Sequence, residues 1–271
     1  MNRRWWARAA AGVALAVAVA LGGTATAEAQ GAIGLIYMNG KQGPTNTPGS
    51  NDIASKGASA GIKVIVPSMP WGQGSWEKIS VTPDQVFGII DGYANQLRAQ
   101  GAQRIVVGGT SLGANVALAY AVARQNVAGV VMAAPGHNPL GSYNRNPSIK
   151  DAIEKACQLA KSGQGNQSFS GADDNQGNSL RISTTAAVYC AWMNPRGQAS
   201  MPVQARQLPA NIPLMLIIGT KDPSFGFAEA NIYQPAAKNP YSKYLVIDGG
   251  EHRNTEHSAS QRIIDWIKGL P

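Results

Sequence analysis

The stretch Gly109-Thr110-Ser111-Leu112-Gly113 has the pattern G-x-S-x-G and lies where the character of the sequence changes abruptly. Residues 104–107 before it form an apolar, partly β-branched run, and residues 114–124 after it are rich in alanine. This order predicts a strand, a tight turn and a helix, with glycines two positions before and after the serine to avoid clashes. Such a turn presents the Ser111 hydroxyl beside a helix N-terminus, which suits a nucleophile; the alternative is a structural serine in a glycine-rich turn.

Further short apolar runs lie on both sides of this stretch. They lack the polar alternation of a half-exposed strand, so they are typical of strands buried on both faces of a parallel sheet. These runs are residues 32–38, 62–66, 127–133, 213–218 and 244–247.

Helical patterns lie between the runs. Thr82-Pro83-Asp84-Gln85 combines an N-cap, a proline at the first helical position and a glutamine three residues after the cap. Ser258 with Gln261 predicts the start of a last helix in the same way. Strands that alternate with helices predict an α/β fold, with a mostly parallel sheet covered by helices on both faces.

Residues 137–210 interrupt this rhythm, because they contain no good strand run. We expect helices over 148–162 and 182–193 and an exposed loop over 166–179, which is rich in Gly, Asn, Gln, Ser and Asp. The segment is interpreted as an insertion that caps the C-terminal edge of the sheet.

The N-terminus has the features of a secretory signal peptide over residues 1–29. Arg3, Arg4 and Arg8 precede an apolar stretch over 9–21, and Ala27-Glu28-Ala29 fits the A-x-A cleavage pattern. An uncleaved N-terminal anchor is the alternative, although the apolar stretch is short for a membrane span. We therefore expect a periplasmic or secreted protein, without stable membrane insertion once the signal is removed.

An exported chain with two cysteines favours one disulfide, here between Cys157 and Cys190. The bridge would contribute about 3–4 kcal/mol in the chain-entropy model. Two buried free thiols are the alternative.

The remaining 242 residues, 30–271, suffice for one large domain. The predicted signal holds three of the 23 Lys and Arg residues and one of the 15 Asp and Glu residues, which leaves a net charge of about +6. The basic residues are scattered, which argues against nucleic-acid binding. The sequence contains no metal-binding cluster or cofactor motif, so we expect neither a metal nor a cofactor.

With its serine turn between strand and helix, the chain resembles the α/β-hydrolase family over nearly all of residues 30–271. In that family the order along the chain is nucleophile, acid, histidine. The resemblance implies that Asp222, after the run 213–218, orients the imidazole of His252, after the run 244–247, and stabilises its charged form. An ordinary turn is the alternative for Asp222, and His257 and His137 are the alternatives for His252. Asp248 is a strand-end residue or a secondary orienter.

An oxyanion hole needs two backbone N–H groups. The resemblance implies Leu112 for one of them and the loop after the first strand for the other. Many relatives have His-Gly in this loop, whereas this chain has Asn39-Gly40. Lys41 is the first choice for the second donor and Gln42 the next.

The resemblance implies a serine hydrolase that cleaves small-molecule carboxylic esters or other acyl compounds through an acyl-enzyme intermediate. A serine peptidase or acyltransferase on the same fold is one alternative, and a non-catalytic exported binding protein is another. Trp71 and Trp192 would line the substrate site, or would pack the insertion onto the sheet.

Overall fold

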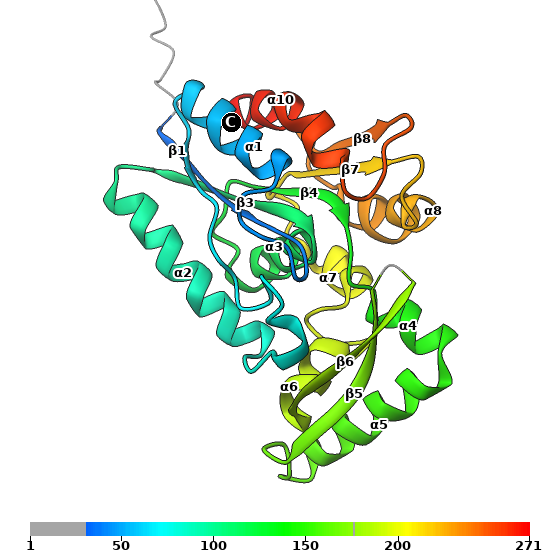
Figure 1. The fold of residues 1–271 in the computed structure, drawn as a ribbon. Helices are drawn as coiled ribbons and strands as arrows, with labels where there is room; N and C mark the ends of the chain where they lie inside the picture. Colours follow the sequence, from blue (N-terminus) through cyan, green and yellow to red (C-terminus); the bar gives the residue numbers. More distant parts are fainter. Residues whose placement is uncertain (1–30, 176) are drawn as a thin grey trace, which may run out of the picture. The chain divides into compact units, whose positions relative to one another are not determined.

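The structure is a computed structural model that describes residues 31–175 and 177–271, so the predicted signal peptide lies outside the described residues. Its centre is a six-stranded sheet in the order β2-β1-β3-β4-β7-β8, in which all neighbours are parallel (Figure 1). Each of the six predicted runs overlaps one of these strands. The strands are β1 (Ile33–Met38), β2 (Lys63–Ile65), β3 (Arg104–Ser111), β4 (Gly129–Pro135), β7 (Leu214–Gly219) and β8 (Lys243–Ile247).

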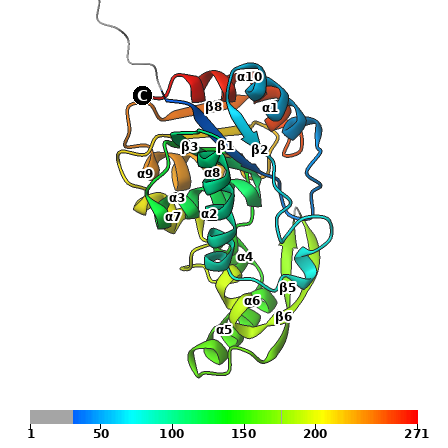
Figure 2. The ribbon, with the colours of Figure 1, turned by 90° about the vertical axis from the view of Figure 1, so that its left-hand side faces the viewer.

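Helices cover both faces of this sheet, as predicted (Figures 1 and 2). α1 (Pro48–Ser59) and α10 (Thr255–Lys268) lie together on one face, and α2 (Pro83–Ala99) and α3 (Leu112–Arg124) lie on the other. All six residues of β1 are buried, with Leu35 and Tyr37 in one apolar cluster and Ile36 and Met38 in the other. The double burial explains why the strand runs show no polar alternation.

Segment 137–210 contains helices and a hairpin. Its elements are α4 (Pro139–Arg145), α5 (Pro147–Lys161), β5 (Ser168–Asn175), β6 (Asn178–Thr185), α6 (Ala186–Met193) and α7 (Met201–Gln207). The helix expected over 148–162 is present as α5. The exposed loop expected over 166–179 is wrong, because most of it belongs to an antiparallel hairpin that pairs Ser168 with Thr185 and Asn175 with Asn178. The helix expected over 182–193 begins only at Ala186.

A disulfide joins Cys157 of α5 to Cys190 of α6, as predicted. It connects the two helices that flank the hairpin in sequence.

The structure confirms one of the two predicted helix starts. Thr82 and Gln85 form the predicted capping box of α2. The predicted start of the last helix at Ser258 is wrong: α10 begins at Thr255, and the Ser258 N–H already bonds to the Asn254 carbonyl within the first turn. Short helical segments complete the structure: Trp76–Lys78, α8 (Phe225–Ala228), Glu229–Tyr233 and α9 (Gln234–Ala236). Across residues 31–175 and 177–271, every helix is too short or too polar to cross a bilayer.

Candidate active site

Ser111 occupies the sharp turn between β3 and α3. Its backbone has φ 54° and ψ −118°, a conformation that costs a non-glycine residue on the order of 1–3 kcal/mol. Close packing on both sides of the serine keeps its backbone in this strained conformation. A Cβ added at Gly109 would lie 2.3 Å from the Met38 carbonyl oxygen, and one at Gly113 would lie 2.1 Å from it. The two glycines of the motif are therefore required because β1 passes directly beside the turn.

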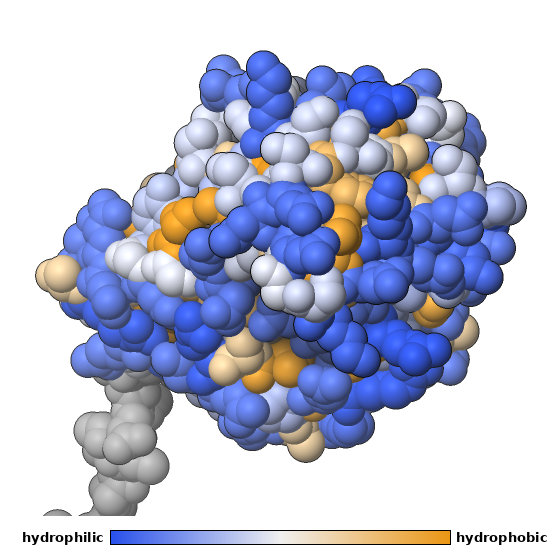
Figure 3. Space-filling view, turned by 90° about the horizontal axis from the view of Figure 1, so that it is seen from below, coloured by the Kyte–Doolittle hydropathy of each residue, from blue (hydrophilic) through white to orange (hydrophobic). Residues whose placement is uncertain are grey.

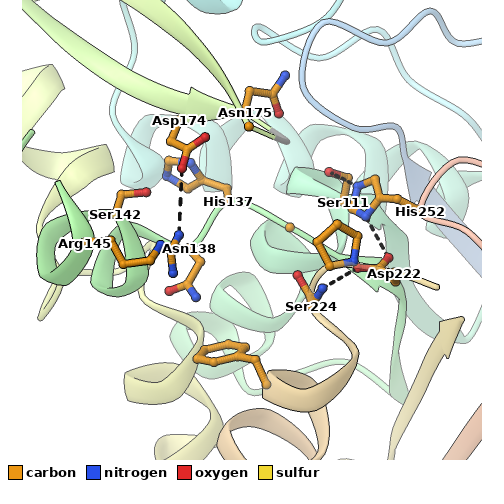
Figure 4. Close-up of a pocket in the computed structure, with 14 residues that line it drawn as sticks. Ser111, His137, Asn138, Ser142, Arg145, Asp174, Asn175, Asp222, Ser224 and His252 are labelled. Carbon is orange, nitrogen blue, oxygen red and sulfur yellow. Dashed lines mark hydrogen bonds and ion pairs between the residues drawn. The ribbon is translucent and has the colours of Figure 1, made fainter. Parts of the chain in front are cut away.

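The three side chains expected from the chain order lie in one hydrogen-bonded line (Figure 4). His252 Nε2 is 3.0 Å from Ser111 Oγ, and His252 Nδ1 is 2.8 Å from Asp222 Oδ2. The His252 side chain is 13% exposed, and that of Asp222 is fully buried. Ser111 ends β3, Asp222 follows β7 and His252 follows β8, so the parallel sheet brings three distant residues to one edge.

The Asp222 carboxylate is fixed by a second hydrogen bond. Its Oδ1 accepts the Ser224 N–H at 2.7 Å, while its Oδ2 faces the imidazole. The two loops that carry the acid and the histidine are also joined, because the Lys221 N–H donates to the Gly250 carbonyl at 2.9 Å. These bonds orient both side chains before any substrate arrives.

The other two histidines of the chain have different surroundings. His257 on α10 is half-exposed and lies 3.1 Å from Asp52. His137 is buried, and its Nε2 lies 3.0 Å from the Trp192 carbonyl, which can only accept, so Nε2 carries the proton. Burial, together with the nearby Lys41 ammonium, lowers the pKa of His137 to about 4. Asp248, which the sequence gives as a strand-end residue or a secondary orienter, accepts the Thr220 hydroxyl through its Oδ1 at 3.4 Å.

The loop after β1 approaches the nucleophile closely. A Cβ on Gly40 would lie 2.9 Å from Ser111 Cβ. The Gln42 N–H donates to the Trp71 carbonyl at 2.8 Å, so it is not available to a substrate. Within residues 31–175 and 177–271, the Lys41 and Leu112 N–H groups have no hydrogen-bond acceptor, and Lys41 and Ser111 line one cavity. Between the two donors considered for this loop, the geometry favours Lys41.

Two cavities meet at Ser111 and His252, one of about 500 Å³ and one of about 460 Å³. Arg145 and Asp174 lie across the larger cavity from Ser111, with 3.8 Å between their charged groups (Figure 4). Most of the side chains that line the larger cavity are polar or charged: Ser111, His137, Asn138, Ser142, Arg145, Asp174, Asn175, Asp222, Ser224 and His252, beside the apolar Pro223 and Phe227. Sequence reasoning missed the contribution of Asp174 and Asn175, because their polar segment gave no sign of a strand.

Trp71 and Trp192 do not line these cavities, which corrects the assignment of their side chains to substrate. Both are fully buried, and their rings meet edge to face with centroids 6.2 Å apart. Trp71 Nε1 donates to the Asn39 carbonyl at 2.8 Å, and Trp192 Nε1 donates to the Val81 carbonyl at 2.7 Å. The alternative interpretation, packing of the insertion onto the sheet, fits these contacts.

Among the described residues, no group of three or more His, Cys, Asp or Glu side chains is placed to hold a metal ion.

Comparison with solved structures shows the same fold at low identity. An α/β hydrolase, GrgF, from Penicillium sp. sh18 is 18% identical with a TM-score of 0.63, covering 89% of this chain and 90% of that one. Est1E from Butyrivibrio proteoclasticus, solved with ferulic acid bound, is 12% identical with a TM-score of 0.60 over 89% and 90% of the chains. A monoacylglycerol lipase from Paleococcus ferrophilus is 15% identical with a TM-score of 0.58 over 86% and 93%.

No curated protein sequence matches the chain. The sequence profile of the alpha/beta hydrolase family matches residues 48–266, which include the serine turn and the loops after β7 and β8. With this match over most of its length and with the parallel sheet described above, the chain belongs to the α/β-hydrolase family.

Proposed function

We propose that the protein is a serine hydrolase that cleaves carboxylic esters, with Ser111 as nucleophile, His252 as general base and acid, and Asp222 as the orienting carboxylate. The observation that carries the proposal is the line from Ser111 Oγ to His252 Nε2 at 3.0 Å and from His252 Nδ1 to Asp222 Oδ2 at 2.8 Å. These distances lie within the hydrogen-bond reach that proton transfer requires.

In the first half-reaction, His252 Nε2 takes the proton of Ser111 as its Oγ attacks the ester carbonyl carbon. Asp222 keeps the Nδ1–H tautomer in place and stabilises the imidazolium that forms. The N–H groups of Leu112 and Lys41 bind the oxyanion, and such donors are usually the largest electrostatic contribution to this chemistry. The imidazolium then protonates the leaving alcohol, which leaves an acyl group on Ser111.

In the second half-reaction, His252 takes a proton from water, and the water oxygen attacks the acyl carbonyl. The tetrahedral intermediate collapses, the acid leaves, and the proton returns to Ser111 Oγ. All groups that move protons belong to this chain.

The cavity lining favours small, polar esters as substrates. Polar groups buried by a long alkyl chain would lose water without gaining a partner. The face of the molecule in Figure 3 is mainly hydrophilic, with its hydrophobic residues in separate patches, so this face presents no single large apolar surface to a lipid.

The direct test is covalent labelling with a fluorophosphonate. We expect the wild-type protein to be labelled on one residue and Ser111→Ala not to be labelled. Labelling that persists in Ser111→Ala would show that another nucleophile acts, and a wild type that neither reacts nor turns over p-nitrophenyl acetate would favour the binding-protein alternative. Cleavage of a matched p-nitroanilide would indicate a peptidase, and acyl transfer to an added alcohol in preference to water would indicate an acyltransferase.

We also propose that the protein is exported, with cleavage after Ala29. The residue pattern of the N-terminus and the disulfide between Cys157 and Cys190 support this proposal. Expression of the full chain in a bacterial host, followed by N-terminal mass determination, tests it: a mature chain that begins at Gln30 is expected, and an intact Met1 in the membrane fraction would contradict it.

A further inference from the structure

A buried ion pair connects the loop beside the nucleophile to the hairpin of the inserted segment. Lys41 Nζ contacts Asp173 Oδ2, and the two side chains are only 3% and 2% exposed. Lys41 follows β1, whereas Asp173 lies on β5, 132 positions later in the chain. A charge pair this deep is costly unless its remaining hydrogen-bonding capacity is satisfied.

The surroundings of the pair meet that condition. Lys41 Nζ also lies 3.2 Å from His137 Nδ1, which accepts because the other ring nitrogen carries the proton. The ammonium is 4.6 Å from the centroid of the Trp76 ring, and Trp76 Nε1 donates to Asp173 Oδ2 at 2.8 Å. Burial alone would raise the pKa of Asp173, but Lys41, His137 and Trp76 hold it below its usual value, so the carboxylate stays charged.

The loop that carries Lys41 is fixed on both sides of this residue. Before it, Gly40 packs against Ser111, and the Asn39 carbonyl accepts the Trp71 indole N–H at 2.8 Å. After it, the Gln42 N–H donates to the Trp71 carbonyl at 2.8 Å. The Lys41 N–H finds no acceptor within the described residues, and the carbonyl of its own peptide unit, that of Gly40, accepts the Gly43 N–H at 3.0 Å. The Lys41 side chain adds a second anchor, through its ion pair with Asp173.

We propose that Asp173 is a positioning residue for the oxyanion hole: through the Lys41 ammonium, the hairpin of the inserted segment helps to hold the Lys41 backbone, and with it the Lys41 N–H, in place. The proposal rests on the proposed function, in which that N–H binds the oxyanion. An apolar pair of similar volume would stabilise a core as well as a buried ion pair does, so stability alone gives no reason for charges here. The directional contacts of Lys41 Nζ with Asp173 and His137 do give a reason for charges here. An oxyanion donor must be placed within a few tenths of an ångström, and directional contacts can hold it there.

The test compares Asp173→Asn and the double variant Lys41→Met/Asp173→Asn with the wild type. The double variant guards against a folding failure, because it leaves no unpaired charge and the amide oxygen introduced at position 173 still accepts the Trp76 N–H. Asp91→Asn is the matched control, since it removes the Asp91–Arg124 ion pair of 2.8 Å on α2 and α3, away from the site.

Three quantities are measured for each variant. The first is kcat per active site, with the sites counted by fluorophosphonate labelling. The second is the inhibition constant of a trifluoromethyl ketone, compared with the inhibition constant of the product acid. The tetrahedral adduct of the ketone places an oxyanion in the hole. The third is amide hydrogen exchange in the peptide that covers residues 39–43, which does not depend on activity.

We expect both Asp173 variants to lose kcat by about 10- to 100-fold per labelled site, since loss of a whole oxyanion donor costs about 10²- to 10³-fold. KM should change less than about threefold, ketone affinity should fall with kcat, and exchange over residues 39–43 should rise; Asp91→Asn should change none of these. Wild-type kcat and unchanged exchange in the Asp173 variants would overturn the proposal while the proposed function stands. A wild type that is neither labelled nor active would instead remove the proposed function.

Discussion

Gly136 lies against the nucleophile: a Cβ at this position would stand 2.5 Å from Ser111 Oγ and 3.4 Å from His252 Cε1. The Gly136 N–H also donates to the Ser111 carbonyl at 3.1 Å, so the backbone after β4 cannot move away freely. We therefore expect Gly136→Ala to push the hydroxyl out of line and to lower kcat by about 10²-fold, as a 1 Å misplacement does.

Gly88→Ala is the matched control for this substitution. Gly88 is exposed on α2, and a Cβ there would meet nothing within 4 Å. It should keep full activity and gain about 0.5–1 kcal/mol of stability from the better helix propensity of alanine. Esterase kinetics and urea unfolding measure both effects; equal activity of the two variants would show that the contact at Gly136 is irrelevant to catalysis.

Asp222→Asn is expected to lower kcat by about 10⁴-fold with little change in fold, because an amide at this site favours the wrong imidazole tautomer. Asp248→Asn, on the neighbouring loop, should change kcat less than about threefold, because Asp248 faces Thr220. Steady-state kinetics on p-nitrophenyl acetate separate the two, and a large loss in the Asp248 variant would reverse their roles.

The polar and charged side chains around the larger cavity predict a preference for short acyl chains. We expect kcat/KM to fall at least about tenfold between p-nitrophenyl butyrate and decanoate, since each CH₂ gains about 0.8 kcal/mol only where the surroundings are apolar. Arg145→Leu should reduce the ratio of kcat/KM for the butyrate to kcat/KM for the decanoate. Arg181→Leu, on the hairpin but outside both cavities at Ser111, should leave this ratio unchanged. A wild type that prefers decanoate would contradict the assignment to small polar substrates.

The buried His137 makes stability depend on pH in a defined window. Its pKa is about 4 in the folded state and about 6.5 when unfolded, so between these values the unfolded chain binds a proton that the folded chain excludes. Stability is therefore lost as the pH falls from about 6.5 to 4, by on the order of 3 kcal/mol, and is unaffected by this group above that window. Urea unfolding at pH 7, 5.5 and 4.5 should show a shallower loss in His137→Gln than in wild type, while the exposed His257→Gln follows the wild type. An equal loss of unfolding free energy with falling pH in all three proteins would refute the contribution of His137.

Most of the central sheet could be predicted from the sequence, because the patterns that indicate its strands are local. The apolar runs, the Thr82 capping box and the two glycines around Ser111 each depend on neighbours in the chain. The positions of Asp222 and His252 followed from the family order, and the structure brings both to Ser111.

The hairpin could not be predicted in the same way. Its first strand, Ser168–Asn175, is built from residues that are typical of loops, and it becomes a strand because it pairs with Asn178–Thr185 and packs on α6. The Asp173–Lys41 ion pair likewise has no local signal, because its partners are 132 positions apart. Trp71 and Trp192 were ambiguous because a tryptophan near a catalytic edge suits packing and substrate contact equally well.

The disulfide has a practical consequence for how the protein is produced. Cys157 and Cys190 are the only cysteines in the sequence, and the whole hairpin from Ser168 to Thr185 lies between them, so the bridge closes a covalent ring around it. A host that keeps thiols reduced would make the same sheet without this ring. Protein from a reducing cytosol and protein from an oxidising compartment should therefore differ first in how readily proteases cut the hairpin, with the sheet itself remaining intact in both.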